Sequence, residues 1–453
     1  MEEESGGSTS QKRSIWKFVS GLAGLLVIGL ALFSSVSDLF ITSESTMVDV
    51  FRFDFFRNEQ VEALGSEDGD IFAGEMRNGW EVLETPFFTF EGYFEDNVKS
   101  GYGTIIFTEG GGSFTGYWQE NRPNGSGTFT SSTGEVLEGN WVEGVLDGFA
   151  FVIYTSGSVF IGEFYEGLPH GHGEYRSVAG FSYVGEFLDG LRHGEGELFR
   201  DGLLEYTGSW EYDQRSGFGV YTAAEDFVYE GYWMNDLRHG FGTLTYPNNS
   251  SYSGYWYEDF QHGQGRFNDV DGLWVYEGDW NQGVKEGQGE IIFEDGTIYT
   301  GFFYGNQMHG AGKYVSSEGW VYEGDFVEGI REGQGLYTFP NGSTFDGQWV
   351  NGVEQGHGIY QDITGWSYDG QWYAGRKEGQ GLLTYESGAT HDGMFENNQP
   401  HGHGTRTYFD ENGFYFATYE GNFAYGRRSG AGVMTYLSGT VMSGQWENDN
   451  FMD

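Results

Sequence analysis

Apolar and polar positions alternate with a period of two along most of the chain, and glycine has a fixed place in the pattern. Positions 322–326 read Tyr-Glu-Gly-Asp-Phe, so the rings and the glycine share one face of a predicted strand and the acids share the other. A second alternating run starts with Gly-Gln-Gly at 333–335 and ends with Pro-Asn-Gly at 340–342, where Asn-Gly is typical of a tight turn. Each such segment therefore predicts one β-hairpin.

This segment recurs along the chain. The aromatic-x-Gly-x-aromatic motif and its variants occur in sixteen copies at a nearly constant interval, with one longer step between Gly393 and Gly421. The middle glycines are Gly92, Gly116, Gly139, Gly162, Gly185, Gly208, Gly231, Gly254, Gly278, Gly301, Gly324, Gly347, Gly370, Gly393, Gly421 and Gly444. A repeat of this length predicts an array of small units that stack on one another. We therefore predict an all-β, elongated solenoid of about sixteen stacked β-hairpins in an antiparallel meander.

The motif, followed by Gly-x-Gly and repeated at this interval, resembles the MORN repeat (membrane occupation and recognition nexus) over residues 88–453. The resemblance implies a twisted β solenoid with a groove lined by the aromatic side chains. It also implies a role as a scaffold, a dimerisation module or a membrane-associated tether. Some copies depart from the pattern: Leu137, His391 and Met442 take the first aromatic position, and Ala150 follows Phe149 where Gly-x-Gly would continue.

The rings of the motif are the candidate binding residues. Glycine between two rings on one strand face leaves room for rings of neighbouring strands to pack across it. The rings predicted to line the groove are Tyr183, Tyr206, Trp210, Tyr229, Trp233, Tyr252, Trp256, Tyr276, Trp280, Tyr299, Tyr322, Trp349, Tyr368 and Trp372. We expect protein partners to bind along them.

A second period, twice as long as the first, indicates that pairs of repeats are the duplicated unit. It relates five aromatic residues that precede alternate motifs: Phe181, Phe227, Trp274, Trp320 and Trp366. It also relates five basic residues that stand two positions before a Gly-x-Gly, here called the basic row: Arg192, Arg238, Lys285, Arg331 and Lys377. Four strands separate its members, which predicts a line of positive charges about 19 Å apart. Two interpretations stay open: a contact strip for an extended anionic partner, or cations balanced by adjacent acids such as Glu286, Glu332 and Glu378.

The N-terminal region predicts a membrane segment. Residues 1–17 are polar and include three basic residues, and residues 18–37 then form a run without a charge. As a helix this run would span about 30 Å, the thickness of a bilayer core. The positive-inside rule predicts a cytoplasmic tail at 1–17, a transmembrane helix or signal anchor at 18–37, and repeats on the extracytoplasmic side. The alternative is a signal peptide cleaved near Ser37. Residues 38–87 are predicted to be a linker and a degenerate capping repeat.

Charge and composition limit the partners. The formal net charge is −46, which repels nucleic acid, so we expect no nucleic-acid partner. The chain has no cysteine, which excludes disulfides, thiolate catalysis and cysteine-based zinc sites. Its 78 glycines and 6 prolines, together with 19% aromatic residues, fit tight turns joined by short strands.

No catalytic motif is recognisable, and we expect no enzymatic activity, cofactor or metal site. Histidines adjoin many Gly-x-Gly motifs, but equivalent positions on neighbouring hairpins would lie about 10 Å apart, too far to share a metal ion. The preferred function is a non-enzymatic, membrane-tethered scaffold or adaptor for protein partners. The alternative is a secreted or cell-surface binder of glycan or peptide. The last motif, ending at Trp446, lacks a recognisable return strand, which predicts an open edge and self-association through the C-terminal end.

Overall fold

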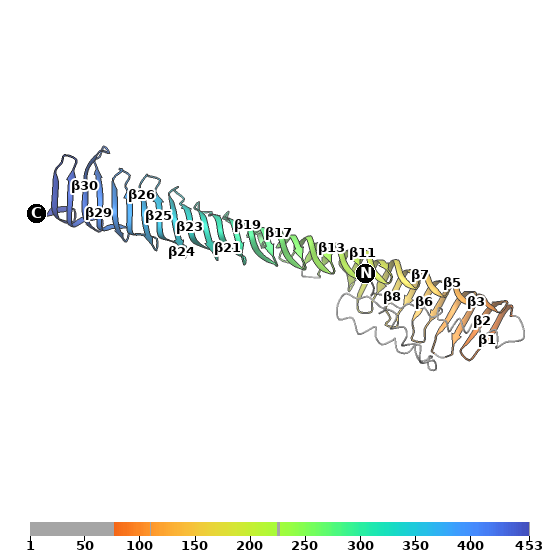
Figure 1. Ribbon diagram of the computed structural model, residues 1–453. Helices are drawn as coiled ribbons and strands as arrows, with labels where there is room; N and C mark the ends of the chain where they lie inside the picture. Colours follow the sequence, from red (N-terminus) through yellow and green to blue (C-terminus); the bar gives the residue numbers. More distant parts are fainter. Residues whose placement is uncertain (1–76, 109, 224–226, 453) are drawn as a thin grey trace, which may run out of the picture. The chain divides into compact units, whose positions relative to one another are not determined.

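The computed structural model describes residues 77–108, 110–223 and 227–452 (Figure 1). The predicted cytoplasmic tail at 1–17, the membrane segment at 18–37 and residues 38–76 of the predicted linker lie outside the described residues. Within the described ranges, no helix has the length and apolar character needed to cross a membrane.

The described chain forms thirty-three β-strands and one short 3-10 helix. It divides into two units, each considered by itself: unit 1 holds 77–223 and 232–237, and unit 2 holds 227–231 and 238–452. The strands that lie in unit 1 are β1 (Gly79–Glu84), β2 (Phe88–Glu95), β3 (Val98–Phe107), β4 (Ser113–Gln119), β5 (Arg122–Thr130), β6 (Val136–Val142), β7 (Val145–Ile153), β8 (Val159–Tyr165), β9 (Leu168–Arg176), β10 (Phe181–Leu188), β11 (Leu191–Arg200), β12 (Leu203–Glu211) and β13 (Gln214–Thr222). Strand β14 (Val228–Met234) belongs in part to each unit.

Unit 2 contains the remaining strands and the 3-10 helix η1 (Val270–Gly272). Its strands are β15 (Leu237–Thr245, of which Leu237 belongs to unit 1), β16 (Ser251–Tyr257), β17 (Phe260–Asn268), β18 (Trp274–Asn281), β19 (Val284–Phe293), β20 (Ile298–Tyr304), β21 (Gln307–Val315), β22 (Val321–Val327), β23 (Ile330–Thr338), β24 (Thr344–Val350), β25 (Val353–Gln361), β26 (Ser367–Tyr373), β27 (Arg376–Thr384), β28 (Thr390–Glu396), β29 (Gln399–Phe409), β30 (Tyr415–Ala424), β31 (Arg427–Tyr436), β32 (Val441–Glu447) and β33 (Asn450–Met452).

Strands that follow one another in the sequence pair antiparallel within each unit, from β1 to β13 and from β15 to β33, which confirms the predicted meander of hairpins. The register places glycine opposite glycine. Gly265 in β17 faces Gly254 in β16 on one side and Gly278 in β18 on the other. The hairpins are closed by turns such as Glu258-Asp259, whose φ angles of 48° and 69° match a type I′ turn.

The core of each hairpin is an aromatic ring that lies over two facing glycines. Tyr252 is fully buried, and a Cβ added to Gly265 would lie 2.3 Å from its Oη and 2.6 Å from its ring carbons. The Tyr252 hydroxyl donates a hydrogen bond to the Tyr255 carbonyl at 2.9 Å, so the phenol is satisfied although it is covered. Only glycine therefore fits under the ring.

The second ring of the motif joins one hairpin to the preceding one. Trp256 Nε1 donates a hydrogen bond to the carbonyl of Gly242, in the hairpin before it, at 3.1 Å. The Trp256 ring meets Tyr252 of its own hairpin edge to face at 5.1 Å and Tyr229 of the preceding hairpin at 5.5 Å. Trp256 is thus held between two tyrosines, and equivalent ring contacts, some of them with phenylalanine, recur in other repeats.

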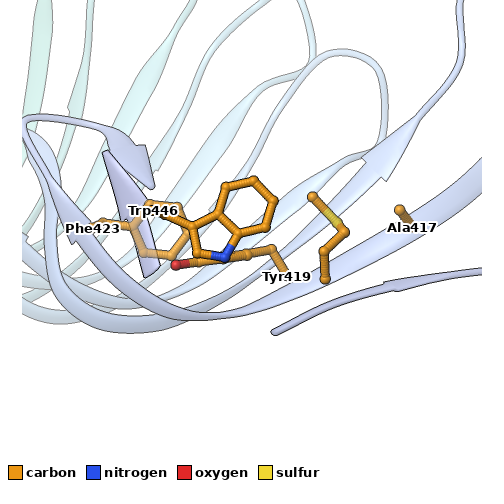
Figure 2. Packing of buried hydrophobic residues seen from close by; sticks show 5 residues of the cluster. Ala417, Tyr419, Phe423 and Trp446 are labelled. Atoms are coloured by element: carbon orange, nitrogen blue, oxygen red, sulfur yellow. The ribbon is translucent and has the colours of Figure 1, made fainter. Parts of the chain in front are cut away.

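Figure 2 shows the same packing near the C-terminus. Tyr419 contacts Phe423 at 5.2 Å and Trp446 at 5.3 Å, and all three rings are buried. The prediction that the last motif lacks a return strand was wrong. Strand β33 pairs with β32 and places Phe451 opposite Trp446. The turn at Asn448-Asp449, with φ angles of 49° and 70°, reverses the chain directly after the motif, and the strand that follows has only three residues, too few to show an alternating pattern.

One of the described repeats has an alanine in place of one of the two facing glycines. Ala150 in β7 takes the place of the second glycine and faces Gly139 in β6. The residue that would supply the covering ring in this repeat is Leu137, which is shorter and branched. The Cβ of Ala150 therefore fits at this position, because Leu137 supplies no aromatic ring to lie over it.

We predict that Gly265→Ala lowers the free energy of unfolding by about 2–3 kcal/mol, because the new methyl group collides with the Tyr252 ring. Tyr252→Leu, which imitates the repeat that carries Ala150, should destabilise by itself. The double variant should cost at least about 1 kcal/mol less than the sum of the single changes, since the methyl group then has no ring to meet. Urea unfolding of the four proteins measures the coupling.

Gln264→Ala is the matched control, because Gln264 lies between Gly263 and Gly265 in the sequence and its side chain is exposed. It should change the free energy of unfolding by less than about 1 kcal/mol. Additive costs for Gly265→Ala and Tyr252→Leu would contradict the ring-over-glycine explanation.

Candidate functional site

The rings predicted to line a groove are buried. The exposed fractions of all fourteen lie between 0% and 9%. Burial also raises the pKa of these phenols, to about 12 for Tyr299, so they stay neutral. The face of the sheet that carries these rings is called the ring-and-cation face below. A partner that binds this face would contact the side chains that lie over the rings.

The basic residues lie in that layer and join successive hairpins. In unit 2, the Arg238 guanidinium carbon lies 4.4 Å from the centroid of the Trp256 ring. Its Nε donates to Asp259 Oδ1 at 2.8 Å and its Nη2 donates to the Asp259 carbonyl at 3.1 Å. Asp259 is the second residue of the next hairpin turn, and its Oδ1 also accepts the backbone N–H of Arg238 at 3.0 Å. Arg238 is thus fixed by a ring and a carboxylate from the following repeat.

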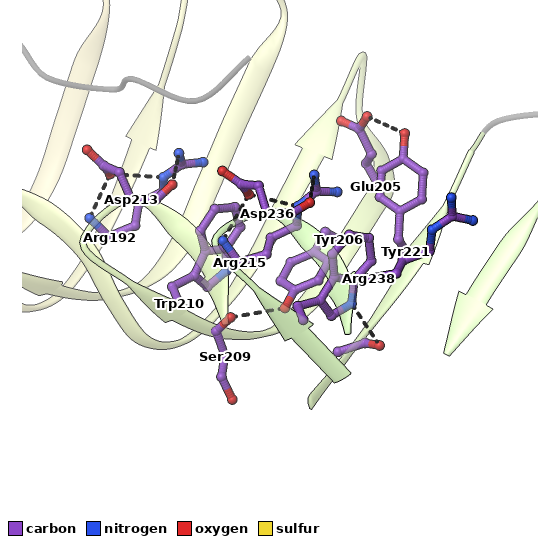
Figure 3. Close-up of polar contacts among 12 residues, drawn as sticks. Arg192, Glu205, Tyr206, Ser209, Trp210, Asp213, Arg215, Tyr221, Asp236 and Arg238 are labelled. Carbon is purple, nitrogen blue, oxygen red and sulfur yellow. Dashed lines mark hydrogen bonds and ion pairs between the residues drawn. The ribbon is translucent and has the colours of Figure 1, made fainter. Parts of the chain in front are cut away.

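Two arginines of unit 1 make the same contacts (Figure 3). Arg192 pairs with Asp213 and Arg215 pairs with Asp236, with Nε–Oδ1 distances of 3.1 and 3.0 Å. Arg192 is only 2% exposed. Burial lowers the pKa of Arg192, and Asp213 opposes that shift, so the guanidinium stays charged inside the packing. A buried charge of this kind has to be paired.

The turn residue changes with the residue that it meets in the preceding repeat. A turn Asp is hydrogen-bonded to an Arg of the preceding repeat, a turn Asn to a Lys and a turn Gly to a Pro. The pairs are Arg192–Asp213, Arg215–Asp236, Arg238–Asp259, Arg428–Asp449, Lys99–Asn121, Lys285–Asn306, Lys377–Asn398, Pro123–Gly144, Pro169–Gly190 and Pro400–Gly426. Glycine also meets residues that are neither basic nor proline: Leu146, Gln261, Met308 and Glu354. Arg77 with Asn97, and Arg331 with Gly352, are exceptions.

The chemistry of the backbone explains this pairing. The turn residue donates its N–H to the carbonyl of the preceding repeat in every pair. An Asp or Asn side chain in the turn then accepts a hydrogen bond from the backbone N–H of the Arg or Lys, whereas proline has no backbone N–H to donate. Arginine can reach the carboxylate as well as the ring, whereas the Lys285 and Lys377 ammonium groups lie over aromatic rings. This coupling is called the turn clamp below.

The structure thus places the basic row in the packing between repeats. The glutamates considered as balancing charges bind elsewhere: Glu286 accepts from Asn281, Glu332 from the Asn351 N–H and Glu378 from the Asn397 N–H. Lys285 and Lys377 lie over Trp274 and Trp366, with Nζ 4.7 and 4.6 Å from the ring centroids. Burial lowers the pKa of both lysines. For Lys285, Arg331 and Lys377, the longer of the two sequence periods therefore relates a tryptophan and the cation that lies over it.

A second set of rings in unit 2 is only partly buried and lies above the buried ones. We call it the ring stack; it consists of Tyr314, Trp320, Tyr337, Phe339, Tyr360 and Trp366. Trp320 is stacked between Tyr314 and Tyr337, with centroid distances of 4.9 and 5.5 Å and interplanar angles of 10° and 22°. Tyr360 and Trp366 are stacked at 4.6 Å.

The ring stack continues across strands and carries charge. Phe339 links its two stacked parts, 4.7 Å from Tyr337 and 5.8 Å from Tyr360. Arg331 lies 5.1 Å from the centroid of Tyr337. The longer sequence period marks Trp320 and Trp366 but not the tyrosines. Their place after each Gly-x-Gly, opposite a buried ring, was the available signal.

His391 is an exception in the buried row. It occupies a tyrosine position in β28, it is fully buried, and both ring nitrogens are buried without a hydrogen-bond partner among the described residues. Its ring lies 4.6 Å from Phe423, and Arg406 stands opposite it in β29. Burial and the adjacent Arg406 charge lower the pKa of His391 to about 4. Arg406 Nη1 donates a hydrogen bond to the Gly426 carbonyl at 3.1 Å. In this turn Gly426 pairs with Pro400, whose side chain has no hydrogen-bond donor.

No group of three or more His, Asp or Glu side chains in the described ranges is arranged to hold a metal ion. The histidines that adjoin Gly-x-Gly instead contact tyrosine rings, as His239 does with Tyr257 at 5.3 Å.

Comparison with known families agrees with these repeats. The MORN repeat matches fifteen segments: 90–112, 114–136, 138–159, 160–180, 183–203, 206–225, 229–251, 252–274, 276–298, 299–321, 322–344, 345–367, 368–390, 391–412 and 419–441. The chain belongs to the MORN-repeat family. The curated proteins contain no match to it.

Solved structures resemble this MORN-repeat chain weakly. The TCP domain of SAS-4 (dCPAP) of Drosophila melanogaster, in complex with a proline-rich motif of Ana2 (dSTIL), is 13% identical; the match covers 39% of this chain and 90% of that chain, with a TM-score of 0.24. The TCP10 domain of Danio rerio CPAP is 11% identical over 60% of this chain and 98% of that chain, with a TM-score of 0.18. Resemblance at this level identifies no shared partner.

His391 should make the stability of this MORN array depend on pH. The pKa of a histidine is about 6.5 in the unfolded chain, against about 4 in the folded protein, so the unfolded chain binds the extra proton between these values. Stability should therefore fall as pH drops from about 6.5 to 4, by up to about 3 kcal/mol. In His391→Tyr this part of the pH dependence should vanish. Urea unfolding at several pH values measures the slope, and His403→Gln, an exposed position in the same unit, is the control. An unchanged slope in His391→Tyr would contradict the assignment.

The turn clamp predicts a specific rescue. Arg238→Lys and Asp259→Asn should each cost about 1–2 kcal/mol of stability, because one member of a hydrogen-bonded pair is replaced. The double variant recreates the Lys–Asn pair of other repeats and should cost at least about 1 kcal/mol less than the sum. Chemical unfolding measures the coupling energy. Strict additivity would show that the pairing of turn residue and cation has no energetic basis.

Proposed function

We propose that this MORN-repeat chain is a non-enzymatic scaffold or adaptor whose ring-and-cation face binds protein partners. The observation that supports this most directly is the ring stack. Its six aromatic side chains are only partly buried, and they lie on the same face as the buried rings of the motif. Aromatic and arginine side chains are enriched at the energetic centres of protein interfaces, and Arg331 lies beside Tyr337. A partner would be held by these rings, with the acidic surface favouring a basic one.

The scaffold is proposed to be tethered to a membrane by residues 18–37, with a cytoplasmic N-terminus and extracytoplasmic repeats. The uncharged run and the basic residues before it support this orientation. The alternative is a secreted or cell-surface binder of glycan or peptide, released by cleavage near Ser37. Protease protection of the repeats and N-terminal sequencing of the mature protein distinguish the two.

Self-association is proposed through the C-terminal edge. Strand β33 is short and, among the described residues, pairs only with β32, through three residue pairs. A strand edge open to a partner is a template for pairing with another chain. Cross-linking of the full chain tests this, and a strictly monomeric result removes it.

The role of the ring stack is tested by Trp320→Ser combined with Trp366→Ser. Alternate repeats carry Ser250 or Ser343 at the same position, so the fold should accept the change. Proximity labelling in the native host, with wild type and variant, should show a set of proteins whose labelling falls at least about tenfold in the variant, as expected when interface hot spots are removed.

Val327→Ser combined with Val350→Ser is the matched control, because both side chains are exposed on the other face of the sheet. It should leave the labelled set unchanged. A set that is identical in wild type and the tryptophan variant would overturn the proposal for this face.

A further inference from the structure

The face of the sheet opposite the ring-and-cation face carries a regular row in unit 2. The row crosses six neighbouring strands, β23 to β28 (Figure 1), and alternates aliphatic and acidic side chains. We call it the outer row; its members are Leu336, Asp346, Ile359, Asp369, Leu382 and Asp392. All six side chains are exposed, and the aliphatic ones are exposed by 38%, 41% and 40%.

The strand register makes this row straight. Leu336 is paired with Asp346, Asp346 with Ile359 and Ile359 with Asp369. Asp369 is then paired with Leu382, and Leu382 with Asp392. Neighbouring strands lie about 4.8 Å apart, so a carboxylate recurs about every 9.6 Å with an aliphatic side chain midway. Beyond Asp392 the register continues through Thr405 to Glu420 and Val433.

Neutral polar residues line both sides of the outer row. On one side the register aligns Thr338 with Thr344, and Thr384 with Thr390. On the other side it aligns Gln334 with Gln348. Two of the acids have local contacts: His357 Nε2 lies 2.8 Å from Asp369 Oδ1, and Gln380 Nε2 donates to Asp392 Oδ1 at 2.9 Å. Each contact engages one carboxylate oxygen and leaves the other open.

The alternation is not required by the repeat. The same positions in unit 1 place Thr104, Thr115 and Thr128 next to one another, followed by Glu138 and Phe151. The outer row is also no metal site, because carboxylates about 9.6 Å apart cannot share an ion whose oxygen ligands lie about 2.4 Å away. What remains is an exposed apolar strip in which negative charge recurs at a fixed interval.

We propose that the outer row binds an extended polypeptide in the polyproline II conformation, with lysine or arginine at every third residue, that runs across the strands. A polyproline II helix has three residues per turn and a rise of about 9.3 Å per turn, so every third side chain points the same way at nearly the interval of the acids. In a β-strand, residues three apart point to opposite sides. In an α-helix, the same-face spacing that comes nearest to the interval of the acids is seven residues, about 10.5 Å, which loses register along the row.

The other features of the face fit this occupant. The residues between the basic ones would pack on Leu336, Ile359 and Leu382. A polyproline II chain has no internal hydrogen bonds, so its carbonyls need donors, and glutamines beside the row carry amide N–H groups. The net charge of −46 favours approach of a basic chain. This surface lies on the opposite face from the ring stack, so the inference goes beyond the proposed scaffold function.

The test uses the full-length protein and a fluorescent peptide with five Lys-Pro-Pro units. Its control peptide has the same composition, with the lysines in one block. Fluorescence anisotropy at low salt should show tighter binding of the regular peptide. Asp346→Asn, Asp369→Asn and Asp392→Asn together should weaken that binding about tenfold, as expected for the loss of three exposed ion pairs.

The matched control removes three acids from equivalent exposed positions of unit 1: Glu91→Gln, Glu138→Gln and Glu197→Gln. The change in net charge is the same, and binding should weaken less than twofold. The proposal is overturned if the two triple variants weaken binding equally, if the blocked peptide binds as well as the regular one, or if neither binds. It is also overturned if the tryptophan variant of the ring stack abolishes peptide binding, because the peptide would then lie on the other face.

Discussion

The contact on which this structure depends is that of an aromatic ring with two glycines on paired strands. The Tyr252 ring occupies the space where a Cβ of Gly254 or Gly265 would stand. Because the ring covers backbone directly, a single sheet can bury large side chains without a second layer of secondary structure above it. The tryptophan that follows closes the space toward the preceding repeat and satisfies its own N–H on a glycine carbonyl there. Burial, hydrogen bonding and repeat-to-repeat packing thus come from one five-residue motif.

The turn clamp follows from the same packing. In the arginine repeats the face of the tryptophan ring is covered by the basic side chain, and a charge taken out of water needs compensation. In the arginine repeats the next turn supplies it, as Asp213 does for the nearly inaccessible Arg192. In the lysine repeats the rings supply it, with Trp274 beneath Lys285. Apart from Asn97, which faces Arg77, an Asp in the turn faces an arginine of the preceding repeat and an Asn faces a lysine, and this links turn chemistry to side-chain packing.

The sequence was enough to predict the hairpins, their number and their order, because ring and glycine positions alternate with strand period and recur at a constant step. It was not enough to place the basic row. Arg238 finds its carboxylate at Asp259, in the next turn, while the adjacent acids that sequence proximity suggests bind elsewhere. The burial of rings such as Tyr322 also depends on how the next repeat packs, and local alternation does not report that. Strand β33 was missed because so short a strand carries too little periodicity to be recognised.

The outer row shows why such a surface is hidden in the sequence. The separation between its members alternates between a shorter and a longer step, as from Leu336 to Asp346 and from Asp346 to Ile359, and this irregular spacing becomes a straight line only through the strand register. The ring face has to keep its rings and glycines, because changes there collide with backbone. The outer face has no such constraint, as the different residues at the same positions of unit 1 demonstrate. A regular pattern on the unconstrained face therefore calls for a cause outside the fold, whereas the regularity of the ring face is explained by the packing itself.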